Sequence, residues 1–332
     1  MTLASIIVPA FNVENTICET LNALLVQTYI NFEIIIVDDG STDDTPRLAD
    51  EFARDSRVRV VRQANRGLAG ARNTGIAASR GDIIGFCDAD DIWEPEKLAV
   101  HMAHLEANPH VGISYSGSAL INDAGDLMGQ AQRPRLHNVD VAVIFKRNPI
   151  GNGSAVVLRR AVLVAVAWRP HHEQARDWYF DETFRQSEDI ECWLRIALTT
   201  EWRFEGVEGL LTRYRINAGG LSAATDRQLA AWERMVIKLT PLNPAFFIVN
   251  TGDARAYQLR YLSRRAISDL DAPRAFALSR AWMAQSRAPL IEEPTKSLVT
   301  LAATAVLSVL GGTVIRQAMA FVQRRRSAGA MS

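Results

Sequence analysis

Apolar runs that end abruptly in polar residues constrain the fold of this chain more than any other feature. The runs lie at 4–9, 33–37, 58–61 and 83–87. Continuous apolar runs are typical of strands that are buried on both faces of a parallel sheet. Between these runs, residues 14–26, 45–54 and 67–79 have patterns that predict helices. The alternation predicts an α/β fold with a Rossmann-like, mostly parallel central sheet flanked by helices.

Polar clusters follow three of the predicted strands at the point where each strand ends. They comprise residues 9–12, 38–41 and 88–91. Ligands of open α/β sheets bind beyond the carboxyl ends of the strands. We therefore expect the three clusters to meet on one rim of the sheet and to form a binding site there.

The most acidic of these clusters lies in the stretch 81–93, GDIIGFCDADDIW. Asp88, Asp90 and Asp91 repel one another unless a cation or solvent relieves them. Carboxylate oxygens suit hard cations such as Mg²⁺ or Mn²⁺, and a divalent ion could in turn hold a phosphate. The simpler alternative is a polar loop that caps the helix after Ile92.

A glycine-rich segment at 64–75 opens the third predicted helix. Gly67, Gly70 and Gly75 do not have the spacing G-x-G-x-x-G, and they follow the third strand rather than the first. A dinucleotide fingerprint is therefore excluded, and no G-x-x-x-x-G-K-[ST] phosphate loop occurs in the sequence.

Composition limits the classes of partner and the compartment. The chain has 332 residues, with 37 basic and 37 acidic side chains, so no overall charge favours nucleic acid. Cys18, Cys87 and Cys192 are isolated within apolar patterns, which predicts neither a disulfide framework nor a zinc site. The N-terminus has no basic segment and no long apolar core of the kind a signal peptide requires. These features predict a cytoplasmic location.

Four collinear motifs together resemble glycosyltransferase family 2, which has the GT-A fold. They are SIIVPAFN, EIIIVDDGSTDDT, GLAGARNTGI and GDIIGFCDADDIW. The resemblance is close over residues 1–110 and looser as far as residue 225. It implies an inverting enzyme that uses a nucleotide-sugar donor and a divalent metal ion (Mg²⁺ or Mn²⁺), without a covalent intermediate.

The resemblance also implies roles for individual residues. The positions expected around the base and ribose are Pro9, Ala10, Phe11 and Glu14. Asp39 corresponds to a carboxylate that accepts a hydrogen bond from the uracil imide, and a carboxylate is suited to that role because it only accepts. Arg72 corresponds to a basic residue near the diphosphate or donor sugar.

The D-x-D element of the family corresponds to Asp88-Ala89-Asp90. The resemblance implies that Asp88 faces the ribose, whereas Asp90 and its neighbour Asp91 face the metal ion. A metal ion that bridges the two phosphates would neutralise the charge that develops on the leaving nucleotide diphosphate.

A second acidic pair lies on the acceptor side. Apolar spacing after residue 188 predicts a helix with Ser187 as its N-cap, so Glu188 and Asp189 fall in the first turn. Their structural explanation is that acidic residues complement the helix dipole. A single displacement also needs a base for the acceptor hydroxyl, and the pair resembles the E-D motif of the family. We expect Asp189 to be the base, with Glu188 as the alternative or as a residue that orients the acceptor.

The segment 211–222 resembles the closing Y-R-x-x-x-x-x-S motif of the family. The resemblance implies that Arg215 could reach the diphosphate, since a guanidinium binds such groups in a bidentate way. The alternative is an arginine on a solvated edge strand. The sequence departs from the commoner form of this motif, because Asn217 occupies a position that usually carries histidine.

Residues beyond 225 predict a helical extension rather than more sheet. We divide the chain into three parts: a GT-A catalytic domain at 1–225, a helical extension at 226–295, and an amphipathic or membrane-associated helix with a basic tail at 296–332. The catalytic domain has a nucleotide-sugar-binding half at 1–110 and an acceptor-side half at 111–225. Residues 297–315 lack charge, and Arg316 and Arg324 to Arg326 follow. This helix can lie in the membrane interface, span the bilayer, or pack as a soluble helix; the positive-inside tendency favours the interface.

The predicted function is sugar transfer from a nucleotide donor, expected to be UDP-linked, to a glycan or lipid-linked glycan at the inner face of the membrane. It would serve cell-surface polysaccharide synthesis. A sugar nucleotidyltransferase is an alternative, although PAFNVENT lacks the glycine-rich loop and basic residue that such an enzyme needs after its first strand. An inactive nucleotide-sugar-binding protein is the other alternative, and the presence of Asp88, Asp90 and Asp189 argues against it.

Overall fold

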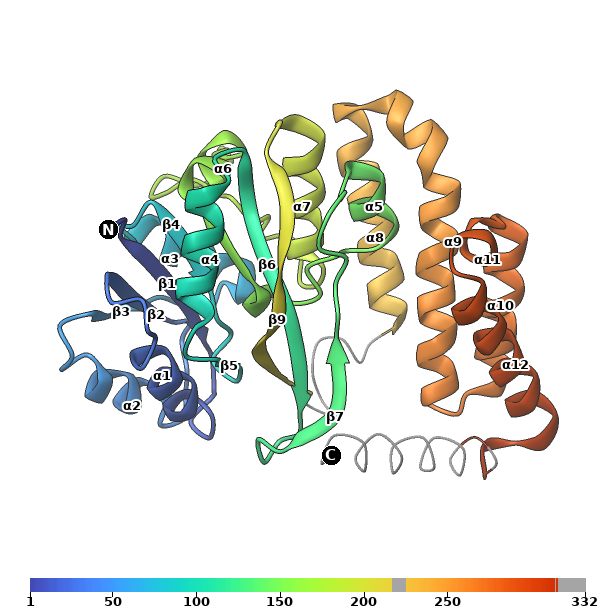
Figure 1. Ribbon diagram of the computed structural model, residues 1–332, viewed down its shortest axis with the longest axis horizontal. Coiled ribbons are helices and arrows are strands. Elements are labelled where there is room, and N and C mark those ends of the chain that lie inside the picture. The colour runs from blue at the N-terminus through green and yellow to red at the C-terminus, as the bar shows by residue number, and fades with distance from the viewer. Residues whose placement is uncertain (217–224, 314, 316–332) are drawn as a thin grey trace. The chain divides into compact units, whose positions relative to one another are not determined.

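The computed structural model describes residues 1–216, 225–313 and 315 of the chain. These residues form two compact units. Unit 1 comprises residues 1–141 and 149–216, and unit 2 comprises residues 142–148 together with the described residues from 225 on. Figure 1 shows a sheet flanked by helices in unit 1 and only helices in unit 2. Each unit is described by itself below.

The first part of unit 1 alternates strands and helices as the sequence predicts. Its elements are β1 Ala4–Ala10, α1 Ile17–Leu25, β2 Phe32–Asp38, α2 Thr45–Phe52, β3 Val58–Arg62, α3 Gly67–Ala78 and β4 Ile83–Phe86. The strands lie side by side in the order β3-β2-β1-β4, and all three pairs are parallel. Every residue of β1 and β2 is buried, which confirms the interpretation of their apolar runs.

The second part of unit 1 extends the same sheet. Its elements are β5 Ile92–Trp93, α4 Lys97–Ala107, β6 Val111–Ile121, β7 Leu127–Gln132, η1 Gly153–Ala155, β8 Val156–Arg159, α6 Arg160–Ala165, α7 Glu188–Thr199 and β9 Arg203–Arg215. The strand order over the described residues continues β4-β8-β6-β9-β5, with β7 on β6. Only β6 and β9 are parallel among these pairs. The sheet is therefore parallel in its first half and mixed in its second.

The register of the parallel strands brings the predicted polar clusters together. Ala10 at the end of β1 pairs with Asp38 at the end of β2, and β1 also pairs with β4, which leads into the acidic loop. The β9 strand pairs with β5 directly after that loop, where Ile92 lies opposite Arg213. The acidic loop therefore runs from β4, in the parallel half of the sheet, to the edge strand β5 in the mixed half.

Gly75 shows why helix α3 needs small residues where it packs on the sheet. A Cβ atom at this position would lie 2.3 Å from Cγ2 of Ile7, a buried residue of β1. We expect Gly75→Ala to lower the free energy of unfolding by about 1–3 kcal/mol, because overpacking moves either the helix or the strand. Urea unfolding of the two proteins measures the difference. Equal stability would show that α3 shifts without cost.

Unit 2 is entirely helical in the part of the chain that the structure describes. Its elements are α5 Val141–Lys146, of which residues from Ala142 on belong to the unit, α8 Thr225–Leu239, η3 Thr240–Leu242, α9 Pro244–Ser268, α10 Ala272–Gln285, α11 Ala288–Glu292 and α12 Pro294–Leu310. Helix α5 follows β7 after a short irregular stretch at 133–140. In α5, Phe145 stacks on Trp232 of α8.

Helix α12 buries three small polar side chains and exposes several large apolar ones. Its buried side chains are Ser297, Thr300, Thr304 and Leu307. Buried Arg260 of α9 donates to Ser297 Oγ at 2.6 Å, and Thr304 shares a hydrogen bond with Ser279 of α10 at 3.0 Å. Three large apolar side chains point outward, with exposed fractions of 58% for Leu298, 63% for Val299 and 80% for Val309, whereas Leu301 and Val306 pack against the core of unit 2.

Candidate functional site

The nucleotide side of the site begins at the ends of β1 and β2. Pro9 and Ala10 are buried, whereas Phe11 exposes 47% of its surface beside them. The carbonyl of Ala10 accepts a hydrogen bond from Asp39 N at 2.9 Å. The carboxylate of Glu14 accepts from Asp44 N at 2.9 Å, which satisfies the backbone next to α2. The predicted base and ribose residues therefore lie around the two strand ends.

Asp39 is buried and held rigidly by its neighbours. Its carboxylate accepts hydrogen bonds from Gln63 Nε2 at 2.6 Å, from Arg66 N at 2.8 Å and from Gly67 N at 2.8 Å. The last two donors lie where α3 begins, so the helix dipole also favours this negative charge. A carboxylate has about four acceptor positions, which leaves capacity for one further donor. The contact of Asp39 with an imide N–H stays a prediction.

Arg72 of α3 joins the acidic loop to helix α7. Its Nη2 contacts Asp88 Oδ1 at 3.0 Å, and its Nη1 contacts Glu188 Oε1 at 2.8 Å. The guanidinium is buried and lies over the rings of Phe86 and Phe180. A Cβ atom on Gly153 would lie 2.3 Å from Arg72 Nη2, so this loop approaches the ion pair closely.

Asp91 is fully buried, and both of its carboxylate oxygens accept hydrogen bonds. Ser154 Oγ donates to Oδ2 at 2.5 Å, and Arg215 N donates to Oδ1 at 2.9 Å. Burial, and after it the charges of Asp90 and Asp88, raise the pKa of Asp91 well above its usual range. Asp91 thus connects the acidic loop, through hydrogen bonds, to residues 151–154 before β8 (the GNGS loop) and to the end of β9.

Asp90 lies in the same loop and is partly buried. In residues 1–216, 225–313 and 315 no group of three or more His, Cys, Asp or Glu side chains is arranged to hold a metal ion. The acidic loop nevertheless brings Asp88, Asp90 and Asp91 close enough for the first two to raise the pKa of the third. Such mutual repulsion is relieved by a cation.

Arg215 lies at the end of β9, and its side chain hydrogen-bonds to the backbone of the acidic loop. Its Nε donates to the carbonyl of Asp90 at 2.9 Å, and its Nη1 donates to the carbonyls of Asn122 and Asp123, each at 2.9 Å. Its Nη2 pairs with Glu19 at 2.6 Å. A contact with a diphosphate would require the guanidinium to exchange some of these partners, and that contact stays a prediction. Asn217 and the remainder of the closing segment lie outside the described residues.

Glu188 and Asp189 occupy the first turn of α7, as the sequence predicts. Burial raises the pKa of Glu188 to about 7, although Arg72 opposes that effect. Burial likewise raises the pKa of Asp189. Ser187 occupies the N-cap position, as predicted, but its side chain makes no capping hydrogen bond and its backbone is left-handed at φ 62°. Strain of this kind is characteristic of functional sites, and here it immediately precedes the acidic pair.

Two further residues at the site were not predicted from the sequence. Tyr214 of β9 is partly buried; burial, together with the nearby charges of the acidic loop and Asp189, raises its pKa. Ser154 holds Asp91 and also accepts from Asp88 N at 2.9 Å. Tyr214 stood within the recognised closing segment, but only the tertiary fold shows which groups it faces. The short GNGS loop carries no chemical signal of its own.

Comparisons with solved structures show the fold. TarS of S. aureus, residues 1–349, solved in complex with UDP-GlcNAc, matches with a TM-score of 0.58 at 18% identity, covering 96% of this chain and 92% of that one. The mannosyltransferase PcManGT of Pyrobaculum calidifontis, solved with GDP-Man and Mn²⁺, matches with a TM-score of 0.57 at 22% identity, covering 93% and 87%. These likenesses confirm the predicted GT-A fold with its helical extension.

Sequence comparisons show the family. Residues 5–166 match the family described as Glycosyl transferase family 2. An uncharacterized glycosyltransferase of Rickettsia felis is 30% identical over 80% of this chain, which spans only 42% of that relative's length. The Escherichia coli protein WfgD, a UDP-Glc:alpha-D-GlcNAc-diphosphoundecaprenol beta-1,3-glucosyltransferase, is 30% identical over 68% of this chain and 82% of its own length. With the four motifs placed on one rim of a GT-A sheet, these matches show that the chain belongs to glycosyltransferase family 2.

Proposed function

We propose that the protein transfers a sugar from a nucleotide donor to a hydroxyl of a glycan or lipid-linked glycan, with inversion at the anomeric carbon. The observation that carries this proposal is the double contact of Arg72. One guanidinium holds both Asp88 of the acidic loop, at 3.0 Å, and Glu188 beside Asp189, at 2.8 Å. The donor-side carboxylates and a candidate base are thus fixed relative to each other, which a single displacement requires.

A UDP-linked donor fits the nucleotide side best. The carboxylate of Asp39 accepts from three protein donors and keeps capacity for an imide N–H, which uracil has. Two Escherichia coli relatives, WfgD and WfaP, are named as UDP-Glc-dependent glucosyltransferases, which supports the same donor class here. Their names also include diphosphoundecaprenol, and this supports a lipid-linked diphosphate sugar as the acceptor class.

A divalent ion, Mg²⁺ or Mn²⁺, fits the chemistry of the acidic loop. We assign its main protein contact to Asp90, because Asp91 would have to exchange its hydrogen bond from Ser154 or Arg215 to bind the ion. Asp91 then orients the loop that presents Asp90. When bound, the ion supplies positive charge that stabilises the departing nucleotide diphosphate.

Asp189 is the proposed base. Glu188 is buried and paired with Arg72, whereas Asp189 is partly exposed at the same helix start. Asp189 takes the proton of the acceptor hydroxyl while that oxygen bonds to the anomeric carbon. The bond from this carbon to the donor phosphate oxygen breaks, and the nucleotide diphosphate leaves with the electron pair.

A screen of nucleotide sugars tests the proposal. Each donor is incubated with the protein, with Mn²⁺ or with EDTA, and release of nucleotide diphosphate is measured with candidate acceptors. We expect metal-dependent release with one UDP-sugar and an acceptor. Release of pyrophosphate from a nucleoside triphosphate would indicate a nucleotidyltransferase. Tight nucleotide binding without turnover on any acceptor would indicate an inactive binding protein.

We further propose that unit 2 contacts the inner face of the cell membrane through α12. None of the helices in the described part of the chain is long and apolar enough to cross a bilayer. The outward apolar face of α12 is suited to the membrane interface, and the arginines after residue 315 in the sequence would favour anionic headgroups. The contact serves access to a lipid-linked acceptor.

Charge placed on this face should weaken membrane binding. We expect Leu298→Asp to reduce sedimentation with phosphatidylglycerol vesicles about tenfold, because burial of one leucine contributes roughly 1.5–3 kcal/mol. Ile248→Asp is a matched control, since Ile248 exposes 83% of its surface on α9 of the same unit. Equal sedimentation of wild type and Leu298→Asp would contradict the contact, as would an equal loss in the control.

A further inference from the structure

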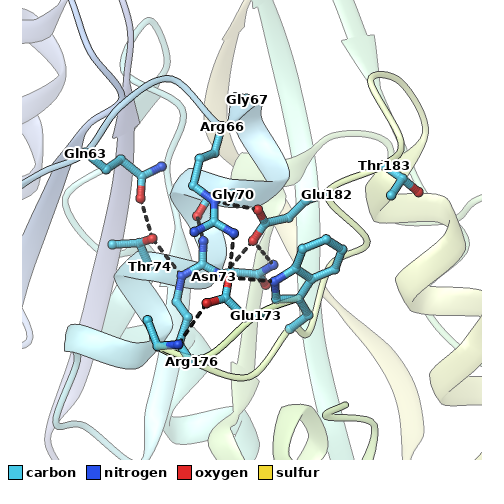
Figure 2. Close-up of polar contacts among 12 residues, drawn as sticks. Gln63, Arg66, Gly67, Gly70, Asn73, Thr74, Glu173, Arg176, Glu182 and Thr183 are labelled. Carbon is cyan, nitrogen blue, oxygen red and sulfur yellow. Dashed lines mark hydrogen bonds and ion pairs between the residues drawn. The ribbon is translucent and has the colours of Figure 1, made fainter. Parts of the chain in front are cut away.

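A buried polar network fastens residues 173–182 to one face of helix α3. Asn73 Oδ1 accepts from the backbone N–H groups of Tyr179 at 3.0 Å and Phe180 at 2.9 Å, and Asn73 Nδ2 donates to the carbonyl of Phe180. Thr74 accepts from Arg176 Nε at 3.0 Å. Figure 2 shows these side chains converging from α3 and from the 173–182 segment. The contacts bind the segment along two turns of the helix.

Glu182 lies at the centre of this network. Its Oε2 accepts from Arg66 Nε at 2.8 Å, and its Oε1 accepts from Arg176 Nη1 at 2.6 Å and from Asn73 Nδ2 at 3.0 Å (Figure 2). Only 7% of its side chain is exposed. A Cβ atom on Gly70 would lie 3.3 Å from Glu182 Oε2 and 2.4 Å from Arg66 Cβ, so the second glycine of the motif makes room for the pair.

Arg66 links this network to the nucleotide side of the site. Its backbone N–H donates to Asp39 at 2.8 Å, while its side chain donates to Glu182 and, through Nη2, to Glu173 Oε2 at 2.5 Å. A hydrogen bond from Ala175 N and the pair with Arg66 lower the pKa of Glu173 to about 2. Arg66 therefore contacts both regions: its backbone N–H binds Asp39, and its side chain binds two carboxylates of the 173–182 segment.

The same segment leads directly into the catalytic helix. Phe180 packs edge-on against Trp193 of α7 and against Phe86 at the end of β4. After Glu182 only five residues separate the network from Glu188, the first residue of α7. Displacement of Glu182 would therefore be transmitted to the start of α7, where the proposed base is located.

We propose that Glu182 is a positioning residue, and that its pair with Arg66 sets the distance between the nucleotide pocket and the base on α7. The inference rests on the proposed function and deepens it. Replacing both partners of a buried ion pair by apolar groups often changes stability little, whereas removal of one partner leaves a buried charge unpaired and displaces the groups around it. A displacement of about 1 Å can cost on the order of 10²-fold in rate. A change at Glu182 should therefore lower the rate of transfer without changing the affinity for the nucleotide-sugar donor.

Glu182→Gln tests this role, because it keeps the shape of the side chain and removes the charge that both arginines share. We expect kcat for sugar transfer to fall about 10–100-fold, with the KM for the nucleotide sugar within about twofold of wild type. Arg66→Ala retains the backbone N–H that supports Asp39, so it should produce the same pattern. The double variant should lose less than the product of the two single losses, because both changes break the Arg66–Glu182 pair.

Glu51→Gln is the matched control. It removes the same charge from a surface pair of unit 1, in which Arg47 Nη1 lies 2.7 Å from Glu51 Oε1 and both side chains are exposed. Its kcat and KM should equal those of wild type. An unchanged kcat in Glu182→Gln would overturn the inference, and so would equal losses of kcat and nucleotide affinity, which would indicate a general structural role.

Hydrogen exchange separates this inference from the proposed function. In Glu182→Gln we expect the amides of residues 186–190 to exchange faster, while those at 33–37 in β2 keep their protection. Hydrogen exchange needs no turnover, so the measurement applies even if the wild-type protein transfers no sugar to any acceptor. That absence of transfer would contradict the proposed function but not the positioning role. Unchanged exchange at 186–190 would overturn the positioning role whatever the activity.

Discussion

Asp189→Asn should lower kcat for sugar transfer by about 10²–10⁴-fold, the usual contribution of a general base. The amide has nearly the shape of the carboxylate but cannot take the proton of the acceptor hydroxyl. Donor binding should stay within about threefold of wild type, because no nucleotide contact is assigned to Asp189. Calorimetric titration with UDP and initial rates of transfer measure the two quantities. Asp44→Asn, in an exposed pair with Arg47, is the control for this change.

The pH dependence of transfer supplies a second measure of the same base. Burial raises the pKa of Asp189, and it raises that of Glu188 to about 7, against the opposing effect of Arg72. The two acids titrate as a pair, and only the ionised base accepts a proton. The rate should therefore fall as pH decreases through a range above the usual value near 4 for aspartate.

Glu188→Gln discriminates between the two acids of this pair. If Asp189 is the base, Glu188→Gln retains the acid limb of the pH profile and loses less rate than Asp189→Asn. A larger loss in Glu188→Gln would transfer the role of base to Glu188. Wild-type rates in both variants would show that the base lies elsewhere.

Asp90→Asn should lower metal-dependent transfer by about 10²–10³-fold, since the loss of one charged group that stabilises a developing anion has effects of this size. It should also weaken Mn²⁺ binding in the presence of UDP, which electron paramagnetic resonance of the free ion measures directly. Asp91→Asn is expected to act differently, because both oxygens of Asp91 accept hydrogen bonds from Ser154 and Arg215. Its main effect should be lower thermal stability.

Full metal-dependent turnover in Asp90→Asn would contradict the metal assignment. Asp44→Asn again serves as the control, because its carboxylate is exposed directly before α2 and pairs with Arg47. If Asp91→Asn lost metal binding as completely as Asp90→Asn while remaining stable, the ion would be held by both acids, as the sequence alone predicts.

The parallel half of the fold could be predicted from the sequence because its strands are buried on both faces. The runs in β1 and β2 are mostly apolar, and every residue in them is buried, including Ser5 and Glu33, which share a hydrogen bond. The two-residue strand β5 carries too little pattern to be recognised. The β7 strand, LMGQAQ, has no buried residue and is defined by pairing with β6. Such elements depend on a partner strand and not on their own composition.

The site divides in the same way. The carboxylates at 88–91 and 188–189 could be predicted, because charge directly after a strand or at a helix start is a local pattern. Their partners could not, because the contacts span long stretches of chain: 116 residues separate Arg72 from Glu188, and 63 separate Ser154 from Asp91. The buried face of α12 could not be predicted either, because residues 297–310 carry no charge and therefore no pattern that separates the buried face of the helix from its exposed face.

The most direct test of the account is the configuration of the product. Wild-type protein is incubated with an α-linked UDP-sugar, Mn²⁺ and the acceptor that supports transfer in the screen, and the new linkage is determined by nuclear magnetic resonance. Single displacement with Asp189 as the base predicts a β-linkage formed together with one UDP per sugar. An α-linked product, or UDP formed without a glycosylated acceptor across the full donor screen, would contradict it.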